Sequence, residues 1–198
     1  MPTLKGKRVA ILVAEGFEQV EMTGPRKALQ DAGAETSIVS PAPGEVQAWK
    51  HFDKADRFAV DVPLEDAAAQ DFDALVLPGG VANPDQLRGQ PKAVEFVKSF
   101  VDAGKPIGVI CHGPWTLIEA GAVKGLKMTS WPTLKTDLKN AGASWVDEEV
   151  VVDRGIVSSR KPDDIPAFSR KLVEEIGEGR HQKGSARAPA RQENRTRH

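Results

Sequence analysis

Hydrophobic residues occur mainly as short uninterrupted runs rich in Val, Ile and Leu, which are separated by longer amphipathic stretches. The four clearest runs cover residues 7–14, 34–41, 71–80 and 105–113. They lack the polar and apolar alternation that marks a sheet with one face in water. The runs therefore predict strands that are buried on both faces.

Helical patterns follow these runs. The clearest are expected at 18–32, 91–103 and 114–123, and the first two are followed at once by Gly33 and Gly104. Glycine is the usual residue just past a helix C-terminus. Strands that alternate with helices predict a mostly parallel central sheet covered on both faces, which is a three-layer α/β sandwich of the flavodoxin-like type.

The rest of the chain contributes shorter elements. A small β-excursion is expected between Pro43 and Asp61, and a hairpin at 148–160 should turn at 153–155. A short strand, a helix and the final helix are expected at 127–131, 133–142 and 161–177. These elements predict one domain over residues 1–179. Residues 180–198 have no apolar periodicity and are expected to form a basic, disordered tail.

Length and charge narrow the functional classes. The 198-residue chain has a formal net charge of -1, which divides into +5 on residues 180–198 and -6 on the remainder. An acidic body disfavours a broad nucleic-acid surface. The apolar run at 9–14 is too short for a signal-peptide core, and no run approaches the roughly 20 residues of a membrane span. A single cysteine excludes an intrachain disulfide, so a cytoplasmic location is expected.

Chemistry is expected at the carboxyl ends of the strands, because ligands of open parallel sheets bind there. Cys111 ends the fourth run and opens a helix, Gly79 and Gly80 end the third, and Glu18 follows the first. The sequence therefore brings a thiol, a flexible backbone turn and a carboxyl group to one edge of the sheet.

Cys111 has two interpretations at this stage. At a strand-to-helix turn the helix dipole and free backbone N–H groups lower a thiol pKa, which favours a nucleophile. The turn resembles the nucleophile elbow of G-x-S-x-G hydrolases, although Gly108 stands one position too early for that pattern. The alternative is an inert core cysteine, which is common.

The neighbours of Cys111 are equally open. The amides of Gly79 and Gly80, with the amide after Cys111, could form an oxyanion hole, or the diglycine could be a plain tight turn. His112 reaches the sulfur only if the turn is sharp. Glu18 could be catalytic or could merely complement the helix dipole, as could other acids nearby, Glu15 and Glu21.

Several motifs occur together in a fixed order, namely "ALVLPGG", "GKPIGVICHGPWTLIEAG", "SWPTLKTDLKNAGASWVDEEVVVD" and "VSSRKPDD". In these motifs the chain resembles the PfpI family of intracellular cysteine peptidases and stress proteins. That family lies within the superfamily of the Parkinson-associated deglycase and has a class I glutamine amidotransferase-like fold. The resemblance covers about residues 7–177.

The resemblance implies roles for individual residues. Cys111 matches the family nucleophile, and Glu18, in "GFE", matches the acid that hydrogen-bonds the thiol. His112 matches the histidine beside the nucleophile, which a carboxylate of a neighbouring subunit orients in PfpI-type oligomers. Asp85, in "NPDQLR", stands at the position of that carboxylate, where relatives often have the longer glutamate.

The amides of Gly80 and His112 would form the oxyanion hole, and Trp131 matches an aromatic residue near the pocket. The resemblance implies a stress-response enzyme whose Cys111 attacks a carbonyl group, as a deglycase or glyoxalase-like enzyme or as a peptidase. A homodimer or larger homo-oligomer is expected, with small aldehydes, proteins or peptides as substrates. No metal or cofactor is expected, because the P-loop and zinc spacings do not occur.

Two other functions are compatible with the same residues. A non-catalytic redox sensor or holdase would use an oxidisable Cys111 whose sulfinic acid Glu18 holds. An amidotransferase module is less favoured, because that class uses a late His-Glu pair on the same subunit, and no histidine occurs between His112 and His181.

Overall fold

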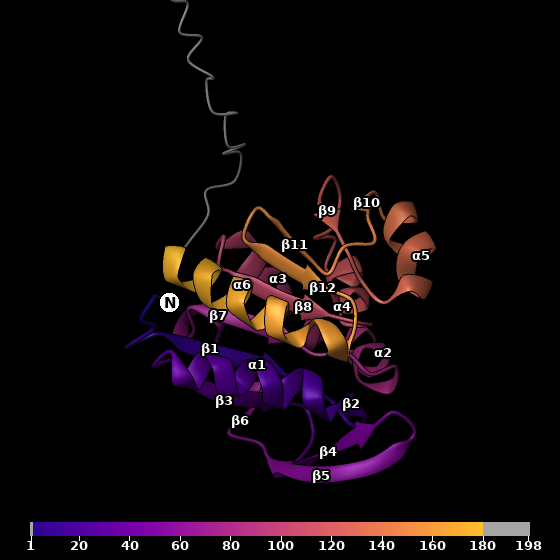
Figure 1. Cartoon of the computed structure of the whole chain (residues 1–198). Coiled ribbons are helices and arrows are strands. Elements are labelled where there is room, and N and C mark those ends of the chain that lie inside the picture. Colours follow the sequence, from indigo (N-terminus) through magenta and orange to yellow (C-terminus); the bar gives the residue numbers. More distant parts are fainter. Residues whose placement is uncertain (1, 180–198) are drawn as a thin grey trace, which may run out of the picture.

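The computed structural model describes residues 2–179, so the expected disordered tail lies outside the described residues. A seven-stranded sheet with the order β11-β12-β8-β7-β1-β3-β6 forms the centre (Figure 1). All neighbouring strands are parallel except β11 and β12, which form the expected hairpin. The strands are β1 (Arg8–Leu12), β3 (Glu35–Ser40), β6 (Val62–Pro63), β7 (Ala74–Leu77), β8 (Ile107–Ile110), β11 (Val150–Asp153) and β12 (Ile156–Ser159).

Helices cover both faces of this sheet, which confirms the predicted three-layer α/β architecture. On one face lie α1 (Gln19–Asp31) and α6 (Ile165–Glu178), seen in front of the sheet in Figure 1. The core on the opposite face of the sheet receives apolar side chains from four helices. These are α2 (Ala82–Arg88), α3 (Pro91–Asp102), α4 (Pro114–Glu119) and α5 (Lys135–Asn140). Residues of β7 and β8 are all buried, because both faces of these strands contact helices.

The parallel register aligns the carboxyl ends of the central strands. Ile11 of β1 pairs with Val76 of β7, and Leu77 pairs with Val109 of β8. The chain therefore leaves β1, β7 and β8 at one edge of the sheet. This edge carries the loops with the candidate functional residues.

Two small sheets flank the main one. The β-excursion is a hairpin of β4 (Glu45–Lys50) and β5 (Asp53–Ala59), and β4 also pairs with β2 (Phe17–Glu18). β9 (Lys127–Met128) pairs with β10 (Ser144–Trp145). Short 3-10 helices complete the described chain at Leu64–Asp66, Ala69–Asp71, Pro132–Leu134 and Pro162–Asp164.

Two local differences from the sequence pattern affect the site. The pattern gives no signal for α2, whose sequence ANPDQLR has no apolar periodicity and buries only Asn83, Pro84 and Leu87. The first helix was expected to include Glu18, but this residue has an extended backbone and belongs to β2. The pairing of β2 with β4 competes with helix formation there, so α1 begins at Gln19.

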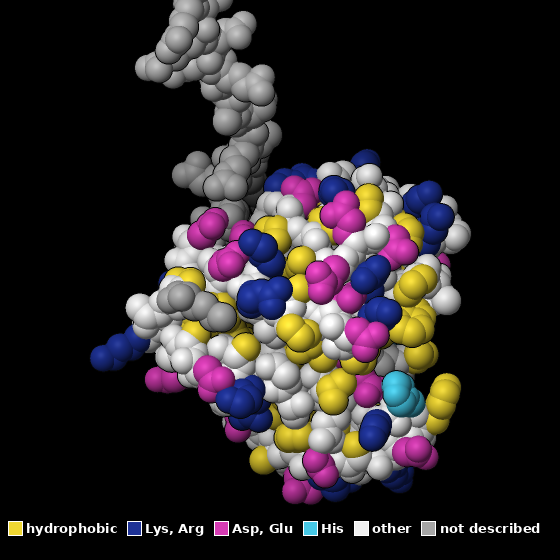
Figure 2. Space-filling view, viewed as in Figure 1, with side chains coloured by type: hydrophobic (Ala, Val, Ile, Leu, Met, Phe, Trp, Pro, Cys, Tyr) yellow, Lys and Arg dark blue, Asp and Glu magenta, His cyan; other side chains and the backbone are white. Residues whose placement is uncertain are grey.

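The surface facing the viewer in Figure 2 carries acidic and basic side chains in close mixture, with hydrophobic side chains scattered among them. Within residues 2–179, no helix has the length and apolar character that crossing a bilayer requires.

Candidate active site

Cys111 has an unusual backbone at the junction of β8 and α4. Its φ of 62° lies in the left-handed region, which costs energy for a residue with a side chain. Such a conformation persists only where the surroundings hold it. The Cys111 N–H donates to the Ser159 carbonyl at 3.1 Å, and the Cys111 carbonyl accepts from the Trp131 N–H at 3.0 Å. The turn is therefore the sharp elbow that the sequence indicated.

Close packing below the elbow depends on Gly113. A Cβ atom there would lie 2.6 Å from the Leu77 carbonyl oxygen and 3.0 Å from that of Ile110. Any side chain would push α4 away from the ends of β7 and β8. The glycine two residues after the thiol therefore keeps Cys111 close to the sheet.

His112 reaches the sulfur in spite of its adjacency in sequence. Its Nδ1 atom lies 3.2 Å from the Cys111 Sγ atom. The imidazole ring packs edge-on to Trp115 at 5.2 Å and is stacked on Trp131 at 5.9 Å between centroids. Burial lowers the pKa of His112, so the imidazole is neutral at pH 7 and can accept a proton.

The carboxyl group against the thiol belongs to Glu21. Its side chain hydrogen-bonds Cys111, and its Oε2 atom accepts from the Gly79 N–H at 2.8 Å. Glu21 is only 1 % exposed, since it belongs to the face of α1 that also buries Met22, Pro25 and Leu29. A glutamate on the core side of an amphipathic helix is thus the sequence signal that would have identified it.

The structure corrects the role expected of Glu18. The Glu18 Oε2 atom accepts from the backbone N–H of His51 at 2.9 Å, at the turn between β4 and β5. Because Glu18 lies in β2 and precedes the helix, its carboxylate bonds to this hairpin, while Glu21 occupies the position beside the thiol. Glu18 still acts on the site at a distance, since its charge contributes to raising the pKa of Glu21.

Burial disfavours ionisation of both Cys111 and Glu21. Burial raises the pKa of Glu21 to about 8, against an ordinary value of 4.5. Burial also raises the pKa of the Cys111 thiol, and the Glu21 negative charge raises it further. This direction is opposite to the lowering predicted from the helix N-terminus, because desolvation outweighs the amides there. Both groups therefore hold their protons at neutral pH, and the site favours at most one ionised acid at a time.

The diglycine supplies backbone close to this pair. The amides of Gly80 and His112 donate to the Cys111 sulfur, and both lower the pKa of the thiol. Gly80 has φ 78°, and a Cβ atom there would lie 2.5 Å from the Gly16 carbonyl oxygen. At Gly79 a Cβ atom would lie 2.5 Å from Glu21 Oε2 and 2.6 Å from the Cys111 Cβ atom. Close approach therefore requires glycine at both positions.

Asp85 lies on α2 with an exposed side chain. Its Oδ1 atom accepts from Arg88 Nη2 at 2.6 Å and from Arg88 Nε at 3.0 Å. The Arg88 guanidinium lies over the Trp115 ring, 4.5 Å from its centroid, and Trp115 in turn contacts His112. No hydrogen bond joins Asp85 to His112 within the described part of this chain, and the orientation of a partner's histidine by Asp85 stays a prediction.

The described residues contain no cluster of side chains suited to a metal ion. Nowhere in residues 2–179 do three or more His, Cys, Asp or Glu side chains gather closely enough to hold a metal ion.

Comparison with known proteins places this geometry in a family. Residues 7–175 match the DJ-1/PfpI family. The chain is 42% identical over 167 residues to the "Putative cysteine protease YraA" of Bacillus subtilis, covering 84% of this chain and 96% of that protein. It is 42% identical over 169 residues to "General stress protein 18" of the same species, covering 85% and 96%.

A third relative is the "Protein/nucleic acid deglycase 2" of Escherichia coli, 40% identical over 172 residues that cover 86% of this chain and 98% of the relative. Among solved structures, Drosophila melanogaster DJ-1beta superposes with a TM-score of 0.79 at 27% identity, covering 86% of this chain and 90% of that chain.

Proposed function

Because this chain belongs to the DJ-1/PfpI family, we propose that it is a stress-response enzyme in which Cys111 attacks a carbonyl carbon. One observation carries the proposal: the Cys111 sulfur lies at an elbow where Glu21 and the amides of Gly80 and His112 all meet it. An inert core cysteine would need none of these partners. The names of the relatives, a deglycase, a cysteine protease and a stress protein, support the same class of chemistry.

Loss of the thiol proton is the first step of the reaction. When the neutral His112 imidazole, 3.2 Å from the sulfur, accepts this proton and Glu21 stays protonated, Cys111 is a thiolate held by the two amides, and its sulfur can form a bond to the carbonyl carbon. The carbonyl π electrons move to oxygen, and the Gly80 and His112 amides donate to the oxyanion. Glu21 then donates its own proton to that oxygen, which leaves a neutral thiohemiacetal, a charged Glu21 carboxylate and a protonated His112.

Aldehydes suit this site better than peptides. Addition to a free aldehyde such as methylglyoxal needs one proton donor and no leaving group, and an adduct of methylglyoxal on a protein releases its amine from a carbinol carbon without cleavage of an amide bond. Peptide hydrolysis also needs an acid that protonates the departing amine, and His112 has no carboxylate to orient it within the described chain. Deglycase or glyoxalase-like activity is therefore the main proposal, and peptidase activity depends on Asp85 of a neighbouring subunit.

A redox sensor is the second candidate, supported by the same buried pair. A protonated Glu21 would donate to a sulfinate oxygen on Cys111, as it donates to the thiolate. Cys111 is 7 % exposed, so only small oxidants such as hydrogen peroxide could reach it. In this function Glu21 takes the place that the family resemblance gave to Glu18.

Methylglyoxal consumption by the full chain tests the enzyme. Wild type should turn over, Cys111→Ala should not, and Glu21→Gln should lose most of the activity because it removes the proton donor. Glu18→Gln is the matched control and should retain it. Turnover that survives Cys111→Ala would remove the nucleophile, whereas a wild type without turnover whose Cys111 gains two oxygens in peroxide would favour the sensor.

A further inference from the structure

The strained backbone of Cys111 is anchored by two segments that are distant in sequence. Its N–H is bonded to Ser159 at the end of β12, and its carbonyl is bonded to Trp131. Neither anchor belongs to the β8–α4 unit that contains the cysteine. The direction of the thiol therefore depends on how these two segments are held relative to each other.

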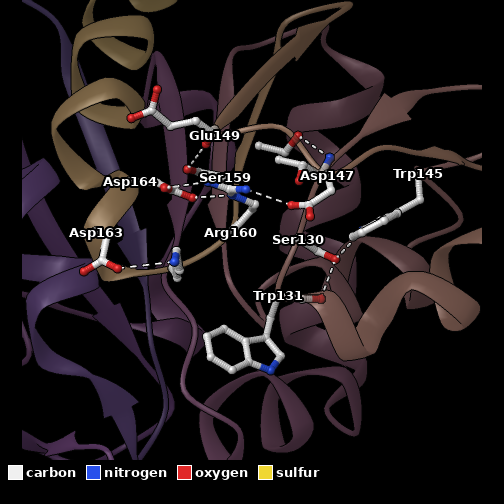
Figure 3. Close-up of polar contacts among 12 residues, drawn as sticks. Ser130, Trp131, Trp145, Asp147, Glu149, Ser159, Arg160, Asp163 and Asp164 are labelled. Atoms are coloured by element: carbon white, nitrogen blue, oxygen red, sulfur yellow. Dashed lines mark hydrogen bonds and ion pairs between the residues drawn. The ribbon is translucent and has the colours of Figure 1, made fainter.

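Arg160 follows Ser159, the first anchor, and its guanidinium group contacts two carboxylates. Its Nε and Nη2 atoms donate to the two oxygens of Asp164 at 2.8 and 3.1 Å, and its Nη1 atom donates to Asp147 at 2.8 Å (Figure 3). The Asp164 side chain is 5% exposed, whereas that of Asp147 is 61% exposed. The planar guanidinium thus joins the start of α6 to the segment that follows β10.

That segment is bonded to the second anchor. Trp145 Nε1 donates to Ser130 Oγ at 2.9 Å, and Ser130 Oγ donates to the Trp131 carbonyl at 2.9 Å. The N–H of Val146 donates to the Met128 carbonyl at 2.9 Å. Figure 3 shows the contacts among Trp145, Ser130 and Trp131 beside Arg160, with the Trp131 indole pointing away from them. From Asp147 the backbone runs through Val146 to Trp145, whose bond to Ser130 leads to Trp131, the residue that bonds the Cys111 carbonyl.

We propose that Arg160 is a positioning residue for the nucleophile. By bridging Asp164 and Asp147 it fixes the Ser159 and Trp131 anchors relative to each other, and this sets the direction of the Cys111 sulfur towards the Gly80 and His112 amides. The inference rests on the proposed function, in which Cys111 is the nucleophile.

The chemistry of the side chain fits this role. Lysine carries one compact charge, whereas the guanidinium fork can bond one carboxylate at two atoms and a second carboxylate at a third. Two acids already occupy Arg160, which leaves it no excess positive charge for an anionic substrate. Positioning also needs geometry rather than charge alone, since small displacements of a reacting group cost much of the rate.

The test compares Arg160→Lys, Arg160→Gln and Asp147→Asn in the full chain. Lys161→Gln is the matched control, because it removes the neighbouring positive charge, whose partner Asp163 has an 82% exposed side chain. The rate of iodoacetamide alkylation of Cys111 is measured by mass spectrometry from pH 6 to 10. Urea unfolding, and kcat and KM for methylglyoxal, are measured on the same proteins.

We expect Arg160→Gln to lower the alkylation rate at pH 7 by about 10- to 100-fold. Arg160→Lys and Asp147→Asn should lower it by about 3- to 10-fold, since each keeps part of the bridge. The rise of the alkylation rate with pH should begin at higher pH than in wild type, because a misdirected sulfur loses its amide donors. The fall in turnover should appear in kcat more than in KM, and Lys161→Gln should match wild type.

The proposal is overturned if Arg160→Lys and Asp147→Asn keep the wild-type pH profile, even when unfolding shows them to be less stable. Loss of Arg160 leaves Asp164 buried without its partner, so Arg160→Gln could fail to fold. In that event the pH profiles of Arg160→Lys and Asp147→Asn test the proposal. A wild type that leaves methylglyoxal unchanged would contradict the proposed function alone, since the alkylation profile reports on positioning without turnover.

Discussion

The two edges of the central sheet bury ionisable groups in different ways. At the amino edge, Lys105 precedes β8, and its Nζ atom donates to the carbonyls of Ala69 and Phe72 at 2.7 and 2.5 Å. At the carboxyl edge, two acids, Cys111 and Glu21, lie against each other. Fixed carbonyl acceptors suit a donor and stabilise the fold. Two neighbouring acids cannot both ionise in a buried site, so the ionisation of either one depends on whether the other holds its proton.

This contrast teaches what separates a structural from a reactive buried group. The Ala69 and Phe72 carbonyl oxygens that accept from Lys105 hold no exchangeable proton, so these contacts have one state. The partner of Cys111 can either hold or release its proton, so the contact has two protonation states, and the Glu21 pKa of about 8 places the change between them near neutral pH. The reactivity proposed for the carboxyl edge depends on this exchangeable proton.

The largest expected effect in this comparison comes from Glu21→Gln at alkaline pH. The pKa of Glu21 is about 8 in the folded protein, above its ordinary value of 4.5, so the folded chain holds a proton that the unfolded chain releases between these pH values. The stability of wild type therefore falls as pH rises through this window, and the variant avoids the loss. The variant should gain at most about 5 kcal/mol relative to wild type at pH 8.5.

Urea unfolding at pH 5, 7 and 8.5 measures this difference. Glu174→Gln is the matched control, since that side chain is exposed and paired with Lys171. Alkylation of Cys111 in Glu21→Gln should also begin at lower pH, because the negative charge of Glu21 and its hydrogen bond to the thiol both raise the thiol pKa. A constant stability difference across this pH range would show that Glu21 is ionised throughout.

Gly80→Ala should have the next largest effect. The new Cβ atom would meet backbone atoms of Gly16 and Glu18 at 2.5 and 2.9 Å, and the φ of 78° adds strain. We expect a loss of about 3 kcal/mol in the free energy of unfolding and nearly complete loss of turnover. Gly44→Ala is the control, because it shares a positive φ but has no neighbouring atom within 4 Å of the added Cβ. Equal losses in both variants would contradict the close-approach explanation.

Lys105→Met should have a smaller effect of a different kind. Removal of the ammonium group leaves two buried carbonyls without this donor, which should cost about 2 kcal/mol. The pH profile of Cys111 alkylation should stay that of wild type, because the two edges share no titrating group. A shifted profile would mean that Lys105 influences the titration of Cys111, which would contradict the separation of the two edges.

The smallest expected effect comes from Glu18→Gln. A glutamine oxygen can still accept from the His51 N–H, so the variant removes mainly the negative charge that helps to raise the pKa of Glu21. The pH dependence of stability should shift slightly to lower pH, with a change below about 1 kcal/mol. A larger effect on alkylation than that of Glu21→Gln would return Glu18 to the position beside the thiol.

The sequence predicted those features that depend on local patterns. Buried apolar runs gave the central strands, and Gly33 and Gly104 marked the ends of α1 and α3 correctly. The elbow at Cys111 also followed from a strand meeting a helix at a glycine. These features need only the residues within one turn or strand.

The choice between Glu18 and Glu21 needed information from further away. It depends on whether the residues before α1 continue the helix or pair with β4, a strand that comes later in the chain. The Arg160 contacts likewise join segments whose proximity no motif indicates. The helix α2 was missed because packing rather than apolar periodicity stabilises it.

The anchoring of Cys111 also has a consequence for biosynthesis. During synthesis the ribosome produces the cysteine well before Ser159 and α6, so the nascent chain lacks the N–H acceptor that holds the elbow. The left-handed turn cannot be maintained until β12 has joined β8. The thiol consequently acquires the elbow geometry only when the segment that ends at Ser159 has folded, and a product truncated before this residue would lack the N–H acceptor that holds the elbow.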